Sequence, residues 1–153
     1  MIIAALLAMS SAAPADRWHI AHDSDPMTDA RKVSVTLNNP PGAMLIVCDS
    51  GSRSGRRQIT VDMGRHLGGR PILREVLVRF DQQPSIAANW GHTGRFVVLL
   101  NDAGPLIEAI ARSRTMAVRA TDYRGANVDL TFDLTGSDRA IDIFETGCAS
   151  IGL

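Results

Sequence analysis

Apolar and polar residues alternate with a period of two along most of this chain. The alternation is cleanest at Val128–Leu134, where every second side chain is apolar. A strand with one buried face produces this pattern. We expect strands at Trp18–His22, Val33–Leu37, Met44–Cys48, Ile59–Met63, Val76–Phe80, Ile86–Trp90, Phe96–Leu100, Met116–Thr121 and Val128–Leu134. Because every position of Phe96–Leu100 is apolar, that strand should be central in its sheet.

Turn-forming residues separate several of these strands. Asn39–Gly42 contains two prolines and a glycine, and Ser50–Gly55 is rich in serine and glycine. Both are typical of hairpin connections, and Arg124–Asn127 is a short turn before the last strand.

Two segments have helical spacing instead. After Asn101 and Asp102, apolar residues at positions 106, 107, 110 and 111 share one helical face, and Pro105 fits a first helical turn. After Gly136, Ser137 is a suitable N-cap. The pattern then places Ile141, Phe144 and Cys148 on one face, which predicts that Cys148 points inward.

The expected fold class is mainly β (α+β): an antiparallel β-sandwich or partly open barrel with two short helices and one disulfide. A ferredoxin-like arrangement, the alternative, has fewer strands than this pattern contains. We see no internal repeat or linker, so residues 16–153 are expected to form a single domain, as the chain length allows.

Residues 1–15 have the features of a signal peptide. Ile2–Met9 is uncharged and apolar, and the small residues of Ala12–Ala15 follow it. The apolar run is shorter than the roughly 20 residues that a membrane-spanning helix needs. No basic residue precedes it, so we expect a signal that is truncated at its start; a buried N-terminal helix or strand is the alternative. The protein is thus expected to be periplasmic or secreted, without a membrane span.

Export changes the interpretation of the two cysteines. In an oxidising compartment Cys48 and Cys148 are expected to form one disulfide, whereas in the cytosol they would be buried thiols. Closing a loop of roughly 100 residues would stabilise the fold by up to about 4–5 kcal/mol. Structural zinc needs four ligands, so these two cysteines alone predict no metal site.

The charge of the chain excludes one class of partner. Sixteen basic and sixteen acidic residues give a net charge of zero, whereas a dedicated nucleic-acid-binding protein is strongly basic. None of the histidines, His19, His22, His66 and His92, lies near a nucleophile motif. His19 and His22 should point to opposite faces of a strand. We therefore predict no catalytic residues, no metal and no cofactor, and a protein that is not an enzyme.

Two segments are candidate binding sites. The first is the basic stretch from Arg53 to Arg74, in which Asp62 is the one compensating acid. Its basic residues are Arg53, Arg56, Arg57, Arg65, His66, Arg70 and Arg74. Such an arginine-rich hairpin is suited to phosphates or carboxylates of an envelope protein or anionic cell-wall component; the alternative is a solvated hairpin that protects a sheet edge. The second candidate is the Asp-Pro loop with Asp25, Thr28 and Asp29, for which the alternative is a structural turn.

The order of several short motifs resembles the type VI secretion accessory proteins VasI and TagO. Trp18 precedes the loop Asp25–Asp29, a strand then ends at Cys48, and Val78–Asp81 leads to Trp90. The strand ending at Phe132–Gly136 and a closing helix with Cys148 complete the likeness, which spans nearly all of the mature chain. The chain departs from this family at Arg57–Met63, where a Thr-Glu-aromatic strand is usual, and at Ala149, where a tryptophan is usual.

The resemblance implies an exported, non-enzymatic accessory protein, associated with type VI secretion in some bacteria. It brings no catalytic residues. The alternative function is that of an enzyme on cell-wall polymers, or of an inhibitor that places one projecting loop in the cleft of a lysozyme-like enzyme.

Overall fold

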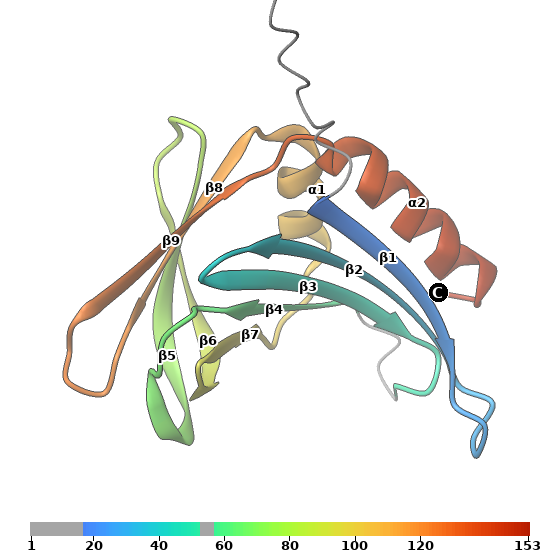
Figure 1. Ribbon diagram of the computed structural model, residues 1–153, viewed down its shortest axis with the longest axis horizontal. Helices are drawn as coiled ribbons and strands as arrows, with labels where there is room; N and C mark the ends of the chain where they lie inside the picture. Colours follow the sequence, from blue (N-terminus) through green and yellow to red (C-terminus); the bar gives the residue numbers. More distant parts are fainter. Residues whose placement is uncertain (1–16, 53–56) are drawn as a thin grey trace, which may run out of the picture.

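The computed structural model describes residues 17–52 and 57–153. They form one antiparallel sheet that curls into a half-barrel, with two helices (Figure 1). The strand order is β1-β2-β3-β4-β7-β6-β5-β8-β9. The strands are β1 (Trp18–Ser24), β2 (Arg31–Asn39), β3 (Gly42–Asp49), β4 (Gln58–Asp62), β5 (Gly68–Phe80), β6 (Ile86–Gly94), β7 (Phe96–Leu99), β8 (Thr115–Thr121) and β9 (Asn127–Asp133), and the helices are α1 (Gly104–Arg112) and α2 (Ser137–Ser150). The predicted mainly β fold with a partly open barrel is confirmed.

The core lies on the inner face of the curled sheet. Cross-strand neighbours Leu37, Met44, Val61 and Val97 align across β2, β3, β4 and β7, and all four are fully buried. Burying each such side chain contributes roughly 1.5–3 kcal/mol relative to exposure. The strand that is apolar at every position, β7, is central as predicted, between β4 and β6.

Strand β5 is much longer than the pattern predicts. The alternation indicated Val76–Phe80, but β5 begins at Gly68. Its first half is exposed or half-buried on both faces and is held by pairing with β6, as at Ile72 and His92. A segment without a buried face gives no alternation, which is why the sequence did not reveal it.

The two helices begin close to where the sequence predicts. In α1, Pro105 lies in the first turn. The N-cap of α2 is Gly136, with φ of 83°, so the prediction of Ser137 as N-cap was wrong. Glycine adopts this left-handed conformation without steric cost. The Ser137 hydroxyl instead donates to the carbonyl of Ile110 at 2.8 Å and ties α2 to α1.

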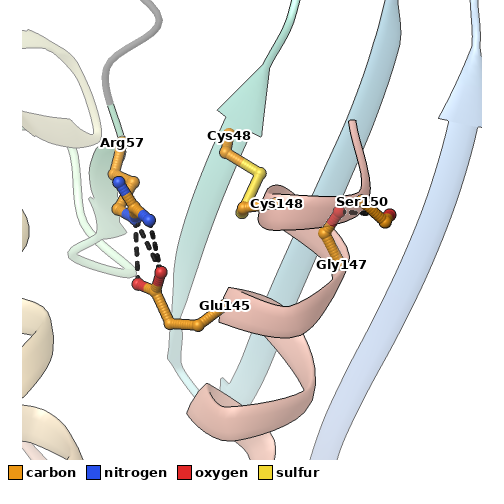
Figure 2. Close-up of a disulfide and its surroundings, with 6 residues drawn as sticks. All are labelled: Cys48, Arg57, Glu145, Gly147, Cys148 and Ser150. Carbon is orange, nitrogen blue, oxygen red and sulfur yellow. Dashed lines mark hydrogen bonds and ion pairs between the residues drawn. A yellow bond between two sulfur atoms is a disulfide. The ribbon is translucent and has the colours of Figure 1, made fainter. Parts of the chain in front are cut away.

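Helix α2 covers the inner face of β1, β2 and β3, and a disulfide fixes it there (Figures 1 and 2). Cys48 and Cys148 are bonded, with their Cα atoms 6.0 Å apart, as predicted. The helix lies close to the sheet because Gly147 has no side chain. A Cβ there would lie 3.0 Å from Val33 and 3.1 Å from His22.

The start of β1 and the connection between β2 and β3 both contact β9 or the residues just after it, at the other edge of the sheet. Trp18 Nε1 donates to the carbonyl of Thr135 at 3.0 Å, and Asn39 Nδ2 donates to that of Thr131 at 2.9 Å. Gly42 packs beside Leu130 of β9. The half-barrel is therefore nearly closed at this end. No helix within the described ranges is long and apolar enough to cross a membrane.

Candidate functional site

The Asp25–Asp29 loop is the turn between β1 and β2, and its polar groups hold the turn together. The Asp25 carboxylate accepts the Met27 backbone N–H at 2.8 Å, and Thr28 Oγ1 accepts that of Ala30 at 3.4 Å. The Met27 N–H and the Thr28 side chain together lower the pKa of Asp25. Asp29 has φ of 55° and donates its N–H to the Asp25 carbonyl. These groups thus make the local turn interactions of an Asx-type loop.

The fold brings this turn beside the loop between β3 and β4. Arg31 N–H donates to Ser50 Oγ at 2.8 Å, and Ser50 N–H donates to the Arg31 carbonyl at 2.9 Å. The start of the second β-hairpin connection, at Ser50, is therefore a spatial neighbour of the Asp25–Asp29 turn. Arg53 and Arg56 lie outside the described residues.

Arg57, the third arginine of that hairpin, pairs with α2 (Figure 2). Its Nε donates to both carboxylate oxygens of Glu145, at 2.9 and 3.0 Å, and its Nη2 also donates to Oε2. Both side chains are about one-third exposed. This two-pronged ion pair fastens β4 to the helix near the disulfide, so the Arg57 guanidinium is engaged within the protein.

A cleft of about 730 Å³ opens where β5 and β8 separate. The two strands pair only from Leu77 and Arg119 to Phe80 and Met116. Beyond that point Arg74 spans the opening. Its Nη1 donates to the carbonyls of Thr121 and Asp122, at 3.2 and 2.7 Å. Lining residues from β5, β8 and the β8–β9 turn are Arg74, Glu75, Arg119, Asp122, Tyr123 and Arg124. We call this the β5–β8 cleft.

The β8–β9 turn forms one wall of the β5–β8 cleft and is shaped by Asp122. This buried carboxylate accepts the backbone N–H groups of Arg124 and Ala126, both at 2.9 Å. The Ala126 and Arg124 N–H groups, and the charges of Arg65 and Arg124, lower the pKa of Asp122. Asp122 is therefore ionised at neutral pH and fixes the turn that presents its two neighbours, Tyr123 and Arg124.

The rim of the cleft combines arginines with an exposed aromatic ring. The Arg124 guanidinium lies 5.1 Å from the centre of the Tyr123 ring, and the His66 ring meets Tyr123 edge-on at 6.2 Å. In the described part of the chain, Arg65, Arg74 and Arg124 form no salt bridge, whereas Arg119 is paired with Asp129 at 2.7 Å. The cleft therefore presents cationic donors to solvent.

Behind Arg74, the inner face of the sheet holds a buried histidine. His92 is 4% exposed, and neither of its ring nitrogens has a hydrogen-bond partner in the structure. Burial lowers its pKa, and the charge of Arg74 lowers it further. An unpaired buried polar group costs about 1–3 kcal/mol, so this side chain does not stabilise the apolar core around it.

In the sequence, Arg65, His66 and Arg74 belong to the basic stretch, but no local pattern joins them to Tyr123 and Arg124. The alternation nevertheless indicates which way two of the polar side chains point. Arg74 is an even number of positions from Val76 and Val78, and His92 is an even number from Ala88 and Trp90, so each shares the inward face of its strand. Two polar residues therefore stand at inward positions of adjacent strands.

The remaining predictions of site residues concern metals and packing. No group of three or more His, Cys, Asp or Glu side chains that could hold a metal occurs in residues 17–52 and 57–153. Trp18 and Trp90 are buried core residues, 8% and 1% exposed. The fold and site thus define a disulfide-stapled half-barrel with a cationic cleft. No protein family model, curated protein or solved structure matches the chain.

Proposed function

We propose that this protein is exported to the bacterial envelope and works there as a non-enzymatic binding protein, in the accessory role that its resemblance to VasI and TagO implies. The β5–β8 cleft is its binding site, and an anionic group of a cell-wall component or envelope protein is its ligand. The observation that carries this proposal is the pair of arginines, Arg74 and Arg124, that line one cleft and form no salt bridge with any residue that the structure describes. The charge of Arg65 also acts on Asp122 in the wall of this cleft.

The Cys48–Cys148 disulfide supports the location. A disulfide that closes a 100-residue loop is typical of proteins from oxidising compartments. Together with the apolar run at residues 1–15, it favours removal of a signal peptide and a mature protein in the periplasm or outside the cell.

The chemistry of the cleft supports the ligand class. Arginine presents several N–H donors in a plane and binds carboxylates and phosphates through paired hydrogen bonds. Tyr123 adds an exposed ring beside Arg124, which is suited to the face of a sugar or an acyl chain next to the anionic group. The Asp25–Asp29 turn and Arg57 are used internally, so they are weaker candidates.

Binding to purified peptidoglycan and to lipopolysaccharide tests the proposal. We expect the wild type to sediment with one of them, and Arg65→Ala/Arg124→Ala to lose at least ten-fold in affinity. The matched control is Arg112→Ala/Arg139→Ala, which removes the same charge from exposed positions on α1 and α2 and should bind like the wild type. Equal losses in both variants, or no binding by the wild type, would contradict the cleft as the site.

The shape of the β8–β9 hairpin favours inhibition of a lysozyme-like enzyme as a second candidate. Its turn projects from the body of the half-barrel (Figure 1), and Arg124 in this turn is exposed to solvent. The clefts of such enzymes contain catalytic carboxylates, which a projecting arginine complements. This function requires that the wild type inhibits lysozyme and that Arg124→Ala does not. It also requires that the wild type does not bind peptidoglycan itself.

A further inference from the structure

The outer face of the sheet carries a row of mostly apolar residues beside the β5–β8 cleft. Strand pairing aligns them across five strands, in the order Leu73, Gly91, Val98, Thr60 and Leu45. Neighbouring strands lie about 4.8 Å apart, so the row is roughly 19 Å long. We call it the outer row.

The outer row is hollowed at Gly91, which has no side chain. Leu100 lies beside this position, because a Cβ on Gly91 would be 3.6 Å from Leu100 Cδ1. Together with Leu73 and Val98, these residues line a hollow of about 350 Å³. Leu73 and Leu100 are 63% and 55% exposed. Single exposed leucines are ordinary, but neighbouring ones around a hollow are typical of a binding surface.

The outer row and the β5–β8 cleft lie on the same face of the sheet. Val76 and Val78 of β5 are buried on the inner face, so the alternate residues Leu73, Glu75 and Leu77 point outward. Glu75 and Leu77 line the cleft, and Leu73 is the next outward residue of β5. A ligand in the cleft can therefore continue onto the outer row without leaving this face.

Charge distinguishes the two ends of this continuous surface. At the cleft end, Arg74 and Arg124 form no salt bridge within the described ranges, and the exposed Tyr123 ring lies beside Arg124. Glu75 is exposed next to Leu73 and repels an anion from the outer row. The surface is thus complementary to a ligand with an anionic group at one end and an apolar chain at the other.

We propose that the ligand is the phosphorylated lipid end of lipopolysaccharide, with a phosphate at Arg74 and Arg124 and one acyl chain along the outer row. This inference rests on the proposed function and selects lipopolysaccharide over peptidoglycan and over an envelope protein. The arginines bind the phosphate through paired hydrogen bonds. The sugar that joins phosphate and chain packs on Tyr123, a contact that a simple phospholipid does not make. Burial of methylene groups on the outer row adds affinity.

Intact and fully deacylated lipopolysaccharide test the acyl chain, because both forms keep the sugars and phosphates. We expect the wild type to bind the intact form at least ten-fold more tightly, and Leu73→Asn/Leu100→Asn to bind both forms equally weakly. Both leucines are exposed, so this variant should unfold at nearly the wild-type temperature. The matched control is Ile86→Asn/Ile143→Asn, which changes exposed residues at the start of β6 and on α2 and should bind like the wild type. If the wild type binds both forms equally, or if the leucine variant keeps the preference, the outer row does not hold the chain.

Smaller probes test the placement of the phosphate and the source of the lipid. Dodecyl phosphate should bind the wild type at least ten-fold more tightly than inorganic phosphate does. Glu75→Gln should bind dodecyl phosphate more tightly than the wild type, because it removes the repelling carboxylate; an unchanged affinity would contradict the placement of the phosphate beside Glu75. Vesicles of phosphatidylglycerol should bind more weakly than lipopolysaccharide, and equal binding would overturn lipopolysaccharide as the source.

The two proposals fail in different ways. If Arg65→Ala/Arg124→Ala loses binding to peptidoglycan while the wild type does not bind lipopolysaccharide, the cleft stands and the lipid inference is wrong. If the wild type binds neither polymer, but binds dodecyl phosphate in a way that Leu73→Asn/Leu100→Asn abolishes, the outer row holds an acyl chain and the envelope ligand of the proposed function is wrong.

Discussion

The half-barrel has two sides that use their polar groups in opposite ways. On the side that α2 covers, polar groups are engaged within the protein: Cys48 with Cys148, Arg57 with Glu145, and Ser137 with Ile110. On the side where β5 and β8 separate, Arg65 and Arg124 have no salt bridge in the part of the chain that the structure describes, and His92 has no hydrogen-bond partner.

This difference separates stability from binding. The covered side concentrates covalent and ionic links near the C-terminal helix, so changes there should lower the free energy of unfolding. The cleft side contains groups that the fold does not need, and functional sites commonly depart from the best local packing in this way. Changes in the cleft should therefore alter binding while leaving stability nearly constant. The predictions below test this contrast.

Loss of the disulfide should have the largest effect. Both cysteines are fully buried, and the bond closes a 100-residue loop. Cys48→Ala/Cys148→Ala should lower the free energy of unfolding by up to about 4–5 kcal/mol, because the unfolded chain gains conformational freedom. Urea denaturation measures this change. The free energy of unfolding of Arg65→Ala/Arg124→Ala, on the cleft side, should stay within about 0.5 kcal/mol of the wild-type value. If both double variants lose a comparable free energy of unfolding, the two sides do not differ in their contribution to stability.

Gly42→Ala should have the next largest effect, since it acts where the two sides meet. A Cβ at Gly42 would lie 2.3 Å from the Asp62 carbonyl oxygen and 2.4 Å from Leu130 Cδ1. The backbone of β4 and the packing of β9 would both have to shift, at a cost of roughly 1–3 kcal/mol. Gly69→Ala is the control, because nothing lies within 4 Å of the added Cβ. If Gly42→Ala and Gly69→Ala unfold at the same temperature, the chain is not closely packed at Gly42.

The sequence predicts the covered side much better than the cleft side. The period of two reveals each strand with a buried face, and the helical spacing at Ile141, Phe144 and Cys148 correctly turns the cysteine inward. These features depend on local pattern. The cleft depends on sheet order, which places β8 beside β5 and so joins Arg74 to a turn some 50 residues later.

The same limit explains the outcome for Arg57. Its position in a run of arginines gives it the pattern of a solvated or ligand-binding residue. Its actual partner, Glu145, is 88 residues away and becomes a neighbour only because the disulfide and the helix bring α2 across the sheet. Charge patterning along a sequence does not contain that information.

Arg57→Ala should have a smaller effect than Gly42→Ala. The ion pair is partly exposed, so solvent screens it, and it should contribute about 1 kcal/mol or less. A double-mutant cycle with Glu145→Gln isolates the pair from other changes. We expect a coupling energy above zero that decreases in high salt. The exposed pair of Arg112 and Glu108 on α1, 3.5 Å apart, serves as the comparison and should show weaker coupling.

Neutralising Asp122 should have the smallest effect on global stability and a defined dependence on pH. Its folded-state pKa is held below the ordinary 3.8, first by the N–H of Ala126 and then by Arg124 and Arg65. A carboxyl with a lowered pKa stabilises the fold above its unfolded-state pKa, and this contribution disappears as pH falls through the folded-state value.

Asp122→Asn keeps the shape of the side chain and removes its charge. The variant should therefore be less stable than the wild type at pH 6, and the difference should vanish in strong acid, where both side chains are neutral. Thermal unfolding from pH 6 to pH 2 measures it. A difference that persists unchanged at pH 2 would mean that the amide disturbs the β8–β9 turn by its geometry, and that the charge of Asp122 does not hold this wall of the cleft.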